Sequence, residues 1–216
     1  HARRTARAQA EAQLRQLLLV GAQAAREHLA TQGDQGWPVP VAVADALRLA
    51  LELAVELAAH DKTYEGMVFK FVEHFYYIAA AMNRGGQDGM WDDEDGFYYD
   101  ILRLPDGSAT RLKVRSLVGL LPLCATTVIE KEQRERVPNA MRYVQERLRR
   151  IPELSATMHP TGPGHFGVAE RGILALVNPE RLRRILTRML DENEFLGPHG
   201  IRSISKFHEQ HPYVLH

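Results

Sequence analysis

Residues 64–82, YEGMVFKFVEHFYYIAAAM, carry the strongest structural signal in the chain. Large apolar side chains recur in this segment at steps of three or four residues: Tyr64, Val68, Phe71, Phe75, Ile78 and Met82. This spacing places them all on one face of an α-helix. Burial contributes about 1.5–3 kcal/mol for each large apolar side chain, which is enough to order the segment against other helices. The pair Gly85-Gly86 predicts where this helix ends.

Similar spacing predicts further helices on both sides of this segment. Upstream, after a break rich in Gly and Pro at residues 33–40, a helix is predicted to begin near Asp45. Downstream, apolar spacing predicts helices around residues 137–148 and 178–189. By contrast, residues 1–46 are rich in Ala, Arg and Gln and contain few large apolar residues. They are therefore predicted to be a poorly patterned N-terminal segment.

A β-hairpin is predicted between residues 97 and 115. Residues 97–104 are rich in aromatic and branched side chains, and residues 105–108 (PDGS) form a turn. Polar and apolar residues then alternate from Arg111 to Arg115, so one face of the hairpin is expected to be covered. The helices and this one hairpin together predict a mainly α fold.

The composition narrows the class of protein. The chain has 216 residues, and its 27 Lys and Arg balance its 27 Asp and Glu, so no excess positive charge favours nucleic acid or an anionic membrane as partner. No apolar run approaches the ~20 residues that a membrane-spanning helix needs. The single cysteine, Cys124, excludes an intramolecular disulfide and a cysteine-rich zinc site and suits a reducing compartment. We therefore expect a cytoplasmic protein with neither nucleic acid nor a membrane as partner.

The densest polar cluster is the run DGMWDDEDGFYYD at residues 88–100. If Gly96 took the sixth position of a calcium-binding EF-hand loop, Trp91 and Leu102 would stand where the loop needs its first and last acidic ligands. Trp, Tyr and Asp mixed on a loop suit a carbohydrate, whose CH faces pack on rings and whose hydroxyls bind carboxylates. A solvated acidic turn whose aromatic residues cap the hairpin explains the same residues and is the commoner case.

The residue pattern indicates neither a catalytic pair nor a metal site. Residues 92–95 are adjacent acids, whereas glycoside cleavage needs two carboxyl groups about 5–9.5 Å apart on opposite sides of a sugar ring. The ten histidines show no metal-binding pair four residues apart with an acid on the same helical face, so no metal and no cofactor are expected. The basic run 131–150 could bind nucleic acid, but no known module accompanies it, and it is predicted to be the outer face of a helix.

The segment GPHGIRSIS at residues 197–205 is a second candidate site. Arg202 and the neighbouring hydroxyl groups could direct several hydrogen-bond donors into a cleft. An ordinary turn after the preceding helix explains the segment equally well.

Several segments, taken together and in order, resemble bacterial glucosidase-type proteins of glycoside hydrolase family 63, the family of mannosyl-oligosaccharide glucosidases. The resemblance extends from about Leu47 to Tyr213 and omits residues 1–46. The blocks that carry it are EGMVFKFVEHF (65–75), MWDDEDGFYYD (90–100), LRLPDGS (102–108), VRSLVGLLPL (114–123), MLDENEFLGP (189–198) and GIRSIS (200–205).

The resemblance implies both a fold and a reaction. The fold is an (α/α)6 toroid, of which residues 47–216 would form the C-terminal part, with a β-hairpin inserted near 97–115. The reaction is inverting hydrolysis of an α-glucosidic or related linkage in an oligosaccharide substrate, in which one carboxyl group protonates the leaving oxygen and another activates water. In that family the acid lies upstream of the matched region and the base downstream of the GIRS-like turn. Neither segment is found here, so no catalytic residue is assigned, and the chain is expected to be a fragment of a longer hydrolase.

Resemblance and side-chain chemistry together assign a substrate-binding set. Trp91 would stack on a sugar, Asp92 and Asp95 would contact its hydroxyls, and Arg202 with Ser203 would donate hydrogen bonds near the reaction centre. The full set is Trp91, Asp92, Asp95, Tyr98, Arg202 and Ser203. Part of a toroid would leave the apolar faces of its inner helices uncovered, which predicts self-association. The alternative is a non-catalytic helical module that binds carbohydrate or serves as a scaffold.

Overall fold

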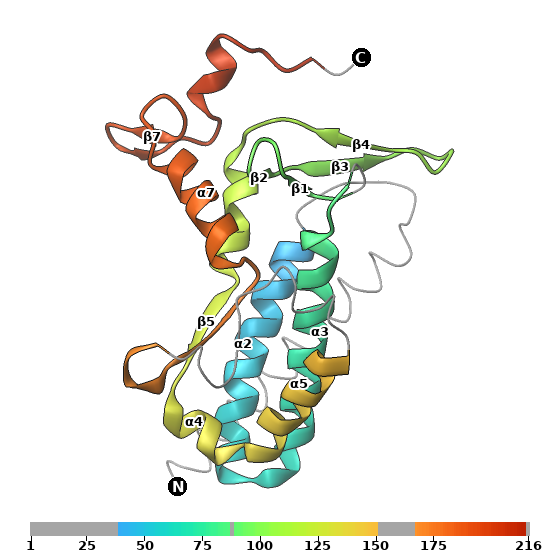
Figure 1. Cartoon of the computed structure of the whole chain (residues 1–216), viewed down its shortest axis with the longest axis vertical. Helices are drawn as coiled ribbons and strands as arrows, with labels where there is room; N and C mark the ends of the chain where they lie inside the picture. Colours follow the sequence, from blue (N-terminus) through green and yellow to red (C-terminus); the bar gives the residue numbers. More distant parts are fainter. Residues whose placement is uncertain (1–38, 87–88, 151–166, 215–216) are drawn as a thin grey trace, which may run out of the picture.

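The computed structural model describes residues 39–86, 89–150 and 167–214. Figure 1 shows two regions, a set of packed helices below and a region of short strands with one helix above. No helix in the described residues combines the length and the apolar composition that a membrane span requires.

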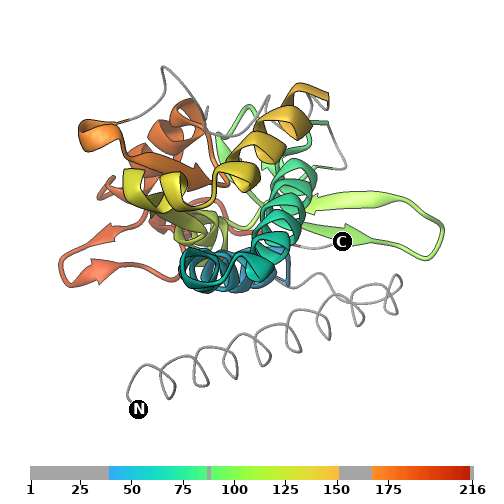
Figure 2. The same cartoon turned by 90° about the horizontal axis from the view of Figure 1, so that it is seen from below.

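The helical region is built on two long helices. α2 (Val39–His60) and α3 (Glu65–Asn83) lie side by side and are joined by the 3-10 helix η1 (Lys62–Tyr64). α4 (Lys131–Arg136) contacts α2, and α5 (Pro138–Arg150) packs along α3. Figure 2 looks at these helices from below and shows them gathered into one bundle.

The core of this region lies on the face of α3 that the sequence predicts. Val68 and Phe75 are fully buried, Phe71 and Met82 are 1% exposed, and the partly buried Tyr64 packs against them. Alanine, valine and leucine side chains from other elements complete the apolar cluster, which explains why the segment is ordered as a helix.

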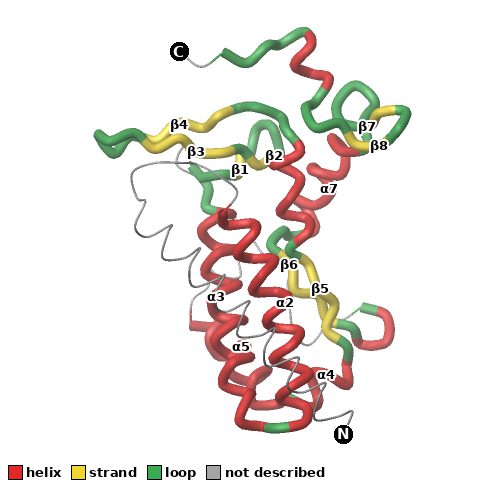
Figure 3. The backbone as a smooth tube through the Cα atoms, turned by 180° about the vertical axis from the view of Figure 1, so that it is seen from behind, coloured by secondary structure: helices red, strands yellow, loops and turns green. Residues whose placement is uncertain are grey.

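All strands of the described structure form short antiparallel pairs. They are β1 (Trp91–Asp92) with β2 (Phe97–Tyr98), β3 (Asp100–Arg103) with β4 (Ala109–Leu112), β5 (Thr126–Ile129) with β6 (Gly172–Ala175), and β7 (Leu196–Gly197) with β8 (Gly200–Ile201). The other elements are the 3-10 helices η2 (Leu117–Cys124), η3 (Val168–Glu170) and η4 (Lys206–Glu209) and the helix α7 (Pro179–Met189). Figure 3 shows that β5 and β6 lie between the helical region and the upper region.

The upper region has an apolar core of its own, which is rich in aromatic side chains. Its buried members are Trp91, Phe97, Tyr98, Tyr99, Leu120, Val177, Ile185 and Phe195. Gly119 lies so close to this core that a Cβ atom there would approach the Phe97 ring to 2.2 Å and the Tyr98 carbonyl to 2.4 Å. The η2 segment can therefore pack against β2 only with glycine at this position.

The predicted fold class is wrong. The described residues form a mixed α and β structure of packed helices and two-stranded sheets, and not a partial (α/α)6 toroid with a single hairpin. Apolar spacing identifies a helix and its buried face but not the partner that covers that face. Strands of two to four residues are too short for alternation to reveal them, and β5 pairs with β6 across a long stretch of sequence.

Most local predictions agree with the structure. The predicted hairpin is present only in part, as β3 and β4, because Phe97 and Tyr98 pair with β1 instead. The C-terminal helix is present as α7, and the helix around 137–148 is α5. The helix expected near Asp45 begins six residues earlier, at Val39, because Pro40 is tolerated in a first turn. Of the predicted N-terminal segment 1–46, residues 1–38 lie outside the described residues, and the remainder belongs to α2.

Candidate functional site

The acidic loop between β1 and β2 is closed by hydrogen bonds between its own residues. The Gly96 N–H donates to the Asp92 carbonyl at 2.8 Å, and the Asp95 N–H donates to Asp92 Oδ1 at 2.9 Å. Gly96 has a backbone φ of 63°, a conformation that residues other than glycine rarely adopt. Trp91 Nε1 donates to Asp93 Oδ1 at 2.7 Å. The turn and the buried indole together fix the positions of the loop's carboxylates.

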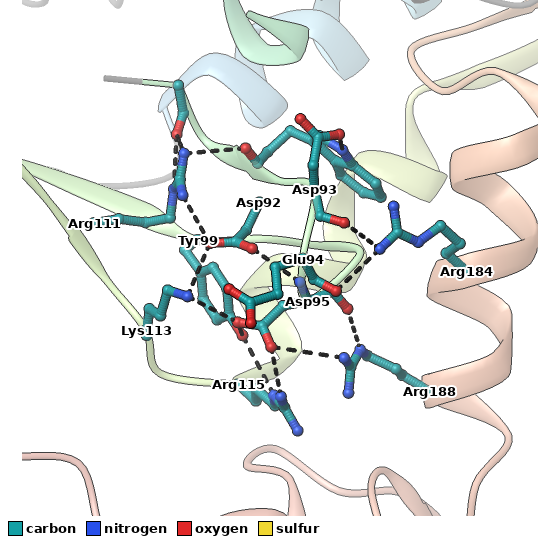
Figure 4. A network of polar contacts seen from close by, with 12 residues as sticks. Asp92, Asp93, Glu94, Asp95, Tyr99, Arg111, Lys113, Arg115, Arg184 and Arg188 are labelled. Atoms are coloured by element: carbon teal, nitrogen blue, oxygen red, sulfur yellow. Dashed lines mark hydrogen bonds and ion pairs between the residues drawn. The ribbon is translucent and has the colours of Figure 1, made fainter. Parts of the chain in front are cut away.

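Three basic residues approach this loop from β4 and the segment that follows it. Arg111 Nη1 lies 2.7 Å from Asp92 Oδ2, and Lys113 Nζ lies 3.0 Å from the same oxygen. Lys113 Nζ also lies 3.3 Å from Asp95 Oδ2, and Arg115 Nη2 lies 2.8 Å from Asp95 Oδ1. The alternation of polar with apolar residues that predicted the hairpin thus brings one cation after another to the same two carboxylates (Figure 4).

Helix α7 holds the loop from the opposite side in Figure 4. Arg184 and Arg188 are four residues apart and therefore share one face of the helix. Arg188 Nε donates to the Asp95 carbonyl at 2.7 Å, and Arg184 Nη2 donates to the carbonyls of Asp93 and Glu94, to the second at 3.1 Å. The closest cations to the loop's carboxylates come from β4 and the segment after it, while α7 bonds mainly to the loop's carbonyls and adds a longer contact of 3.8 Å between Arg188 Nη2 and Asp95 Oδ1.

Arg115 joins this loop to the C-terminal segment. Its Nη1 lies 2.7 Å from Glu194 Oε1, and the Ser205 hydroxyl donates to the other carboxylate oxygen of Glu194. The Arg115 guanidinium lies 3.8 Å from the centroid of the Phe207 ring, and the Arg115 N–H donates to His208 Nε2 at 2.9 Å. We call the ion-paired group the charged cluster; its members are Asp92, Asp95, Arg111, Lys113, Arg115, Arg188 and Glu194.

Pairing in the charged cluster keeps its two loop acids ionised. Burial acts to raise the pKa of Asp92, but hydrogen bonds from the Asp95 N–H and from Lys113 outweigh it and hold this pKa below its usual range. Burial acts the same way on Asp95, but hydrogen bonds from Arg115 and Tyr99 lower its pKa. Both groups are therefore carboxylates at neutral pH and cannot act as general acids.

Two of the predicted sugar-binding residues lie in the core. Trp91 and Tyr98 are each 1% exposed. The Tyr98 hydroxyl donates to Asn83 Oδ1, and the Arg181 guanidinium lies 4.5 Å from the Trp91 ring centroid. Sugar stacking on Trp91 needs a free ring face, and the indole has none in this structure because it anchors the acidic loop instead.

The predicted donors of the GIRSIS block are divided between two environments. Arg202 Nη1 donates to the carbonyls of Glu192 at 3.1 Å and Glu194 at 3.3 Å, so this guanidinium closes its own turn. The Ser203 side chain is exposed, while its carbonyl accepts a hydrogen bond from the Leu117 N–H at 2.7 Å. The structure thus attaches this block to η2, next to Arg115, without aiming Arg202 into a cleft.

Sequence reasoning missed Arg115, Arg188 and Glu194, which connect the predicted residues to one another. Arg115 stands inside a mostly apolar block, and Glu194 lies 79 residues away from it, so no local pattern links the two. A usable signal was present, because the basic residues at 111, 113 and 115 alternate opposite a run of acids. Within the described residues, no group of three His, Cys, Asp or Glu side chains is arranged to hold a metal ion.

Comparison with known proteins gives one informative similarity. No protein-family model matches the chain. The chain is similar to uncharacterized protein YMR196W of Saccharomyces cerevisiae, with 36% identity over 178 residues. The similarity covers 76% of this chain but only 16% of the length of the yeast protein. The chain therefore corresponds to a small part of a much longer relative.

Proposed function

We propose that this chain is part of a glycoside hydrolase resembling family 63 glucosidases, in which it contributes the wall of an oligosaccharide-binding pocket. The charged cluster is the observation that supports this most, because it joins three of the blocks on which the resemblance rests. Arg115 of block 114–123 contacts Asp95 of block 90–100 and Glu194 of block 189–198. Segments that are distant in sequence but meet around one rigid centre can present a single binding surface.

The acids of the charged cluster suit a supporting role and not catalysis. Inverting cleavage needs one carboxyl group with a raised pKa and a second, basic carboxylate about 6.5–9.5 Å from it. Asp92 and Asp95 have lowered pKa values, and Glu194 is paired with both Arg115 and Arg188. The proposal therefore assigns the catalytic acid and base to no described residue.

The surface beside the charged cluster has the chemistry of a site for neutral sugars. Lys113, a member of the charged cluster, has a side chain that is 46% exposed, and Asp93 and Glu94 of the acidic loop are exposed as well. These groups offer both donors and acceptors to sugar hydroxyls. Ion pairs beneath them hold the backbone in place, which lowers the entropy cost of binding.

The test is a calorimetric titration of the chain with kojibiose and with cellobiose, which carry an α and a β linkage respectively, combined with an assay for released glucose. The proposal predicts that kojibiose binds more tightly than cellobiose and that neither is cleaved. Glucose release by this chain alone would show that the catalytic pair is present, and an absence of kojibiose binding would contradict the role of pocket wall.

A second candidate function is a non-catalytic scaffold module, favoured by the internal pairing of the charged cluster and the burial of Trp91 and Tyr98. A scaffold would show no preference for the α-linked disaccharide in the same titration. Both candidates keep a cytoplasmic location, because one cysteine suits a reducing compartment, and neither includes nucleic acid or a membrane as partner. Self-association stays a prediction, which sedimentation equilibrium can check.

A further inference from the structure

A small cavity lies where β3 begins, apart from the ion pairs of the charged cluster. It is lined by Tyr98, Tyr99, Asp100, Val114, Ser116 and Val118, among others. The lining residues come from two of the blocks that carry the resemblance, 90–100 and 114–123. The lining combines apolar side chains with the Asp100 carboxyl group, the Ser116 hydroxyl group and two tyrosines, whose hydroxyl groups already bond to Asn83 and Asp95.

Asp100 differs from the acids of the charged cluster. Arg111 and Lys113 neutralise Asp92, and Arg115 neutralises Asp95. Among the described residues, no hydrogen bond or ion pair engages the partly buried carboxyl group of Asp100. Burial raises the pKa of Asp100 from its usual range, and no cation nearby reverses that effect. A carboxyl group left unpaired at a cavity wall is the kind of group that a ligand can satisfy.

Ser116 offers the second polar group of the cavity. It stands at the N-cap position of η2, but its hydroxyl makes no capping hydrogen bond. Its backbone is nevertheless held, because its N–H donates to the Val114 carbonyl at 2.9 Å and the residue pairs with Ile204 in a β-bridge. The hydroxyl is thus held on a fixed backbone and is free to donate to or accept from a ligand.

The composition of the walls selects the chemical class of ligand. A divalent cation needs six or more oxygen ligands, and one carboxyl group with one hydroxyl group supplies too few of them. An anion is disfavoured, because the lining contains no cationic side chain to bind it. A single hydroxyl group, which is about the size of a water molecule, suits this small cavity, since it can donate to the Asp100 carboxyl group and accept from Ser116.

We propose that Asp100 and Ser116 form a subsite that binds one hydroxyl group of a neutral sugar. This subsite rests on the proposed function and adds two residues that lie outside the predicted substrate-binding set. Asp100 accepts the hydrogen bond from the sugar, and Ser116 donates one to it.

The test compares three variants of the full chain in titrations with kojibiose. Asp100→Asn keeps the shape of the side chain but removes its charge, and Ser116→Ala removes the hydroxyl. Asp106→Asn is the matched control, because Asp106 lies on the turn of the same hairpin and outside the cavity. Asparagine keeps an acceptor oxygen but carries no charge, and replacing a charged acceptor by a neutral one is expected to weaken binding by about tenfold for Asp100→Asn. Ser116→Ala is expected to weaken binding by about fivefold, and Asp106→Asn is expected to leave it unchanged.

A second measurement maps the binding of kojibiose on the unmodified chain by the shifts of backbone amide signals. The subsite predicts the largest shifts at residues 99–101 and 114–119. Binding that is insensitive to Asp100→Asn, with amide shifts elsewhere, would refute the subsite and leave the proposed function standing. Absence of any binding by the unmodified chain would refute both. This map needs no variant, so the test holds even where a substitution impairs folding.

Discussion

The helical region and the upper region of this protein are stabilised by different forces. In the helical region, α2 and α3 bury a continuous set of apolar side chains, with Phe75 fully buried. In the upper region, short strands surround an aromatic core, and the charged cluster ties that core to the C-terminal segment. Apolar burial tolerates variation in partner and angle, whereas ion pairs between buried groups demand fixed geometry. The second arrangement suits a region that must hold a binding surface in one shape.

The largest expected effect is in the helical core. Phe75→Ala removes a fully buried ring and should lower the free energy of unfolding by about 3–5 kcal/mol. Urea denaturation measures this loss. Leu49→Ala is the control, because Leu49 is 37% exposed on α2 and its truncation should cost under about 1 kcal/mol. Equal losses for both variants would mean that α3 does not form the core.

Removing the centre of the charged cluster should have the next largest effect. Arg115→Met removes one ion-pair partner from each of the mostly buried carboxylates of Asp95 and Glu194. Removing one partner of a buried ion pair should lower the free energy of unfolding by about 3 kcal/mol. This is the lower end of the usual range, because the charged cluster is not fully buried. Arg202→Met is the control, since Arg202 bonds only backbone carbonyls of its own turn in the described structure, and it should cost less. A smaller loss for Arg115→Met than for Arg202→Met would contradict the central position of Arg115.

Two glycine substitutions should change stability in opposite directions. Gly119→Ala places a Cβ atom against the Phe97 ring and should destabilise the protein by about 1–3 kcal/mol. Gly66→Ala, in the first turn of α3, meets nothing within 4 Å and should stabilise the protein by about 0.5–1 kcal/mol. Thermal unfolding of the two variants measures both signs. A Gly119→Ala variant that is not destabilised would show that η2 does not pack tightly against β2, and a destabilised Gly66→Ala variant would contradict the open space at Gly66.

The smallest expected effect is the pH dependence of the upper region. The pKa values of Asp92 and Asp95 are lower in the folded protein than in the unfolded chain. Their contribution to stability is therefore present above about pH 4 and lost as the pH falls through the folded-state values. Unfolding measured between pH 6 and pH 2 should show this loss, and the double variant Asp92→Asn with Asp95→Asn should show less of it. An unchanged slope in that variant would assign the pH dependence to other groups.

The sequence predicts the helices well because a buried helical face leaves a signal within a few residues. The stripe from Tyr64 to Met82 needs no knowledge of its partners, and neither does the cap of α7 by Asn178, whose side chain accepts from the Arg181 N–H at 2.8 Å. The arrangement of the helices carries no such local signal. The toroid was therefore predicted from resemblance alone. The described residues do not form it.

The candidate site was predictable in part, because residue type indicates chemistry but not burial. Asp92 and Asp95 stand in a conspicuous acidic run and do meet in one network. Trp91 has the residue type of a sugar-stacking group, yet its burial depends on α7, whose arginines cover the ring from nearly a hundred positions away. Contacts of that sequence separation follow from the fold and cannot be inferred from spacing alone.

The central claim is that Arg115 holds the acidic loop and the C-terminal segment together as one unit. Amide hydrogen exchange of the unmodified chain and of Arg115→Met tests it most directly. The account predicts faster exchange in the variant at the amides of Gly96, Ser205 and His208, which are hydrogen-bonded in the native chain, with α2 and α3 unchanged. Faster exchange at only one of these places, or equally throughout the helices, would contradict it.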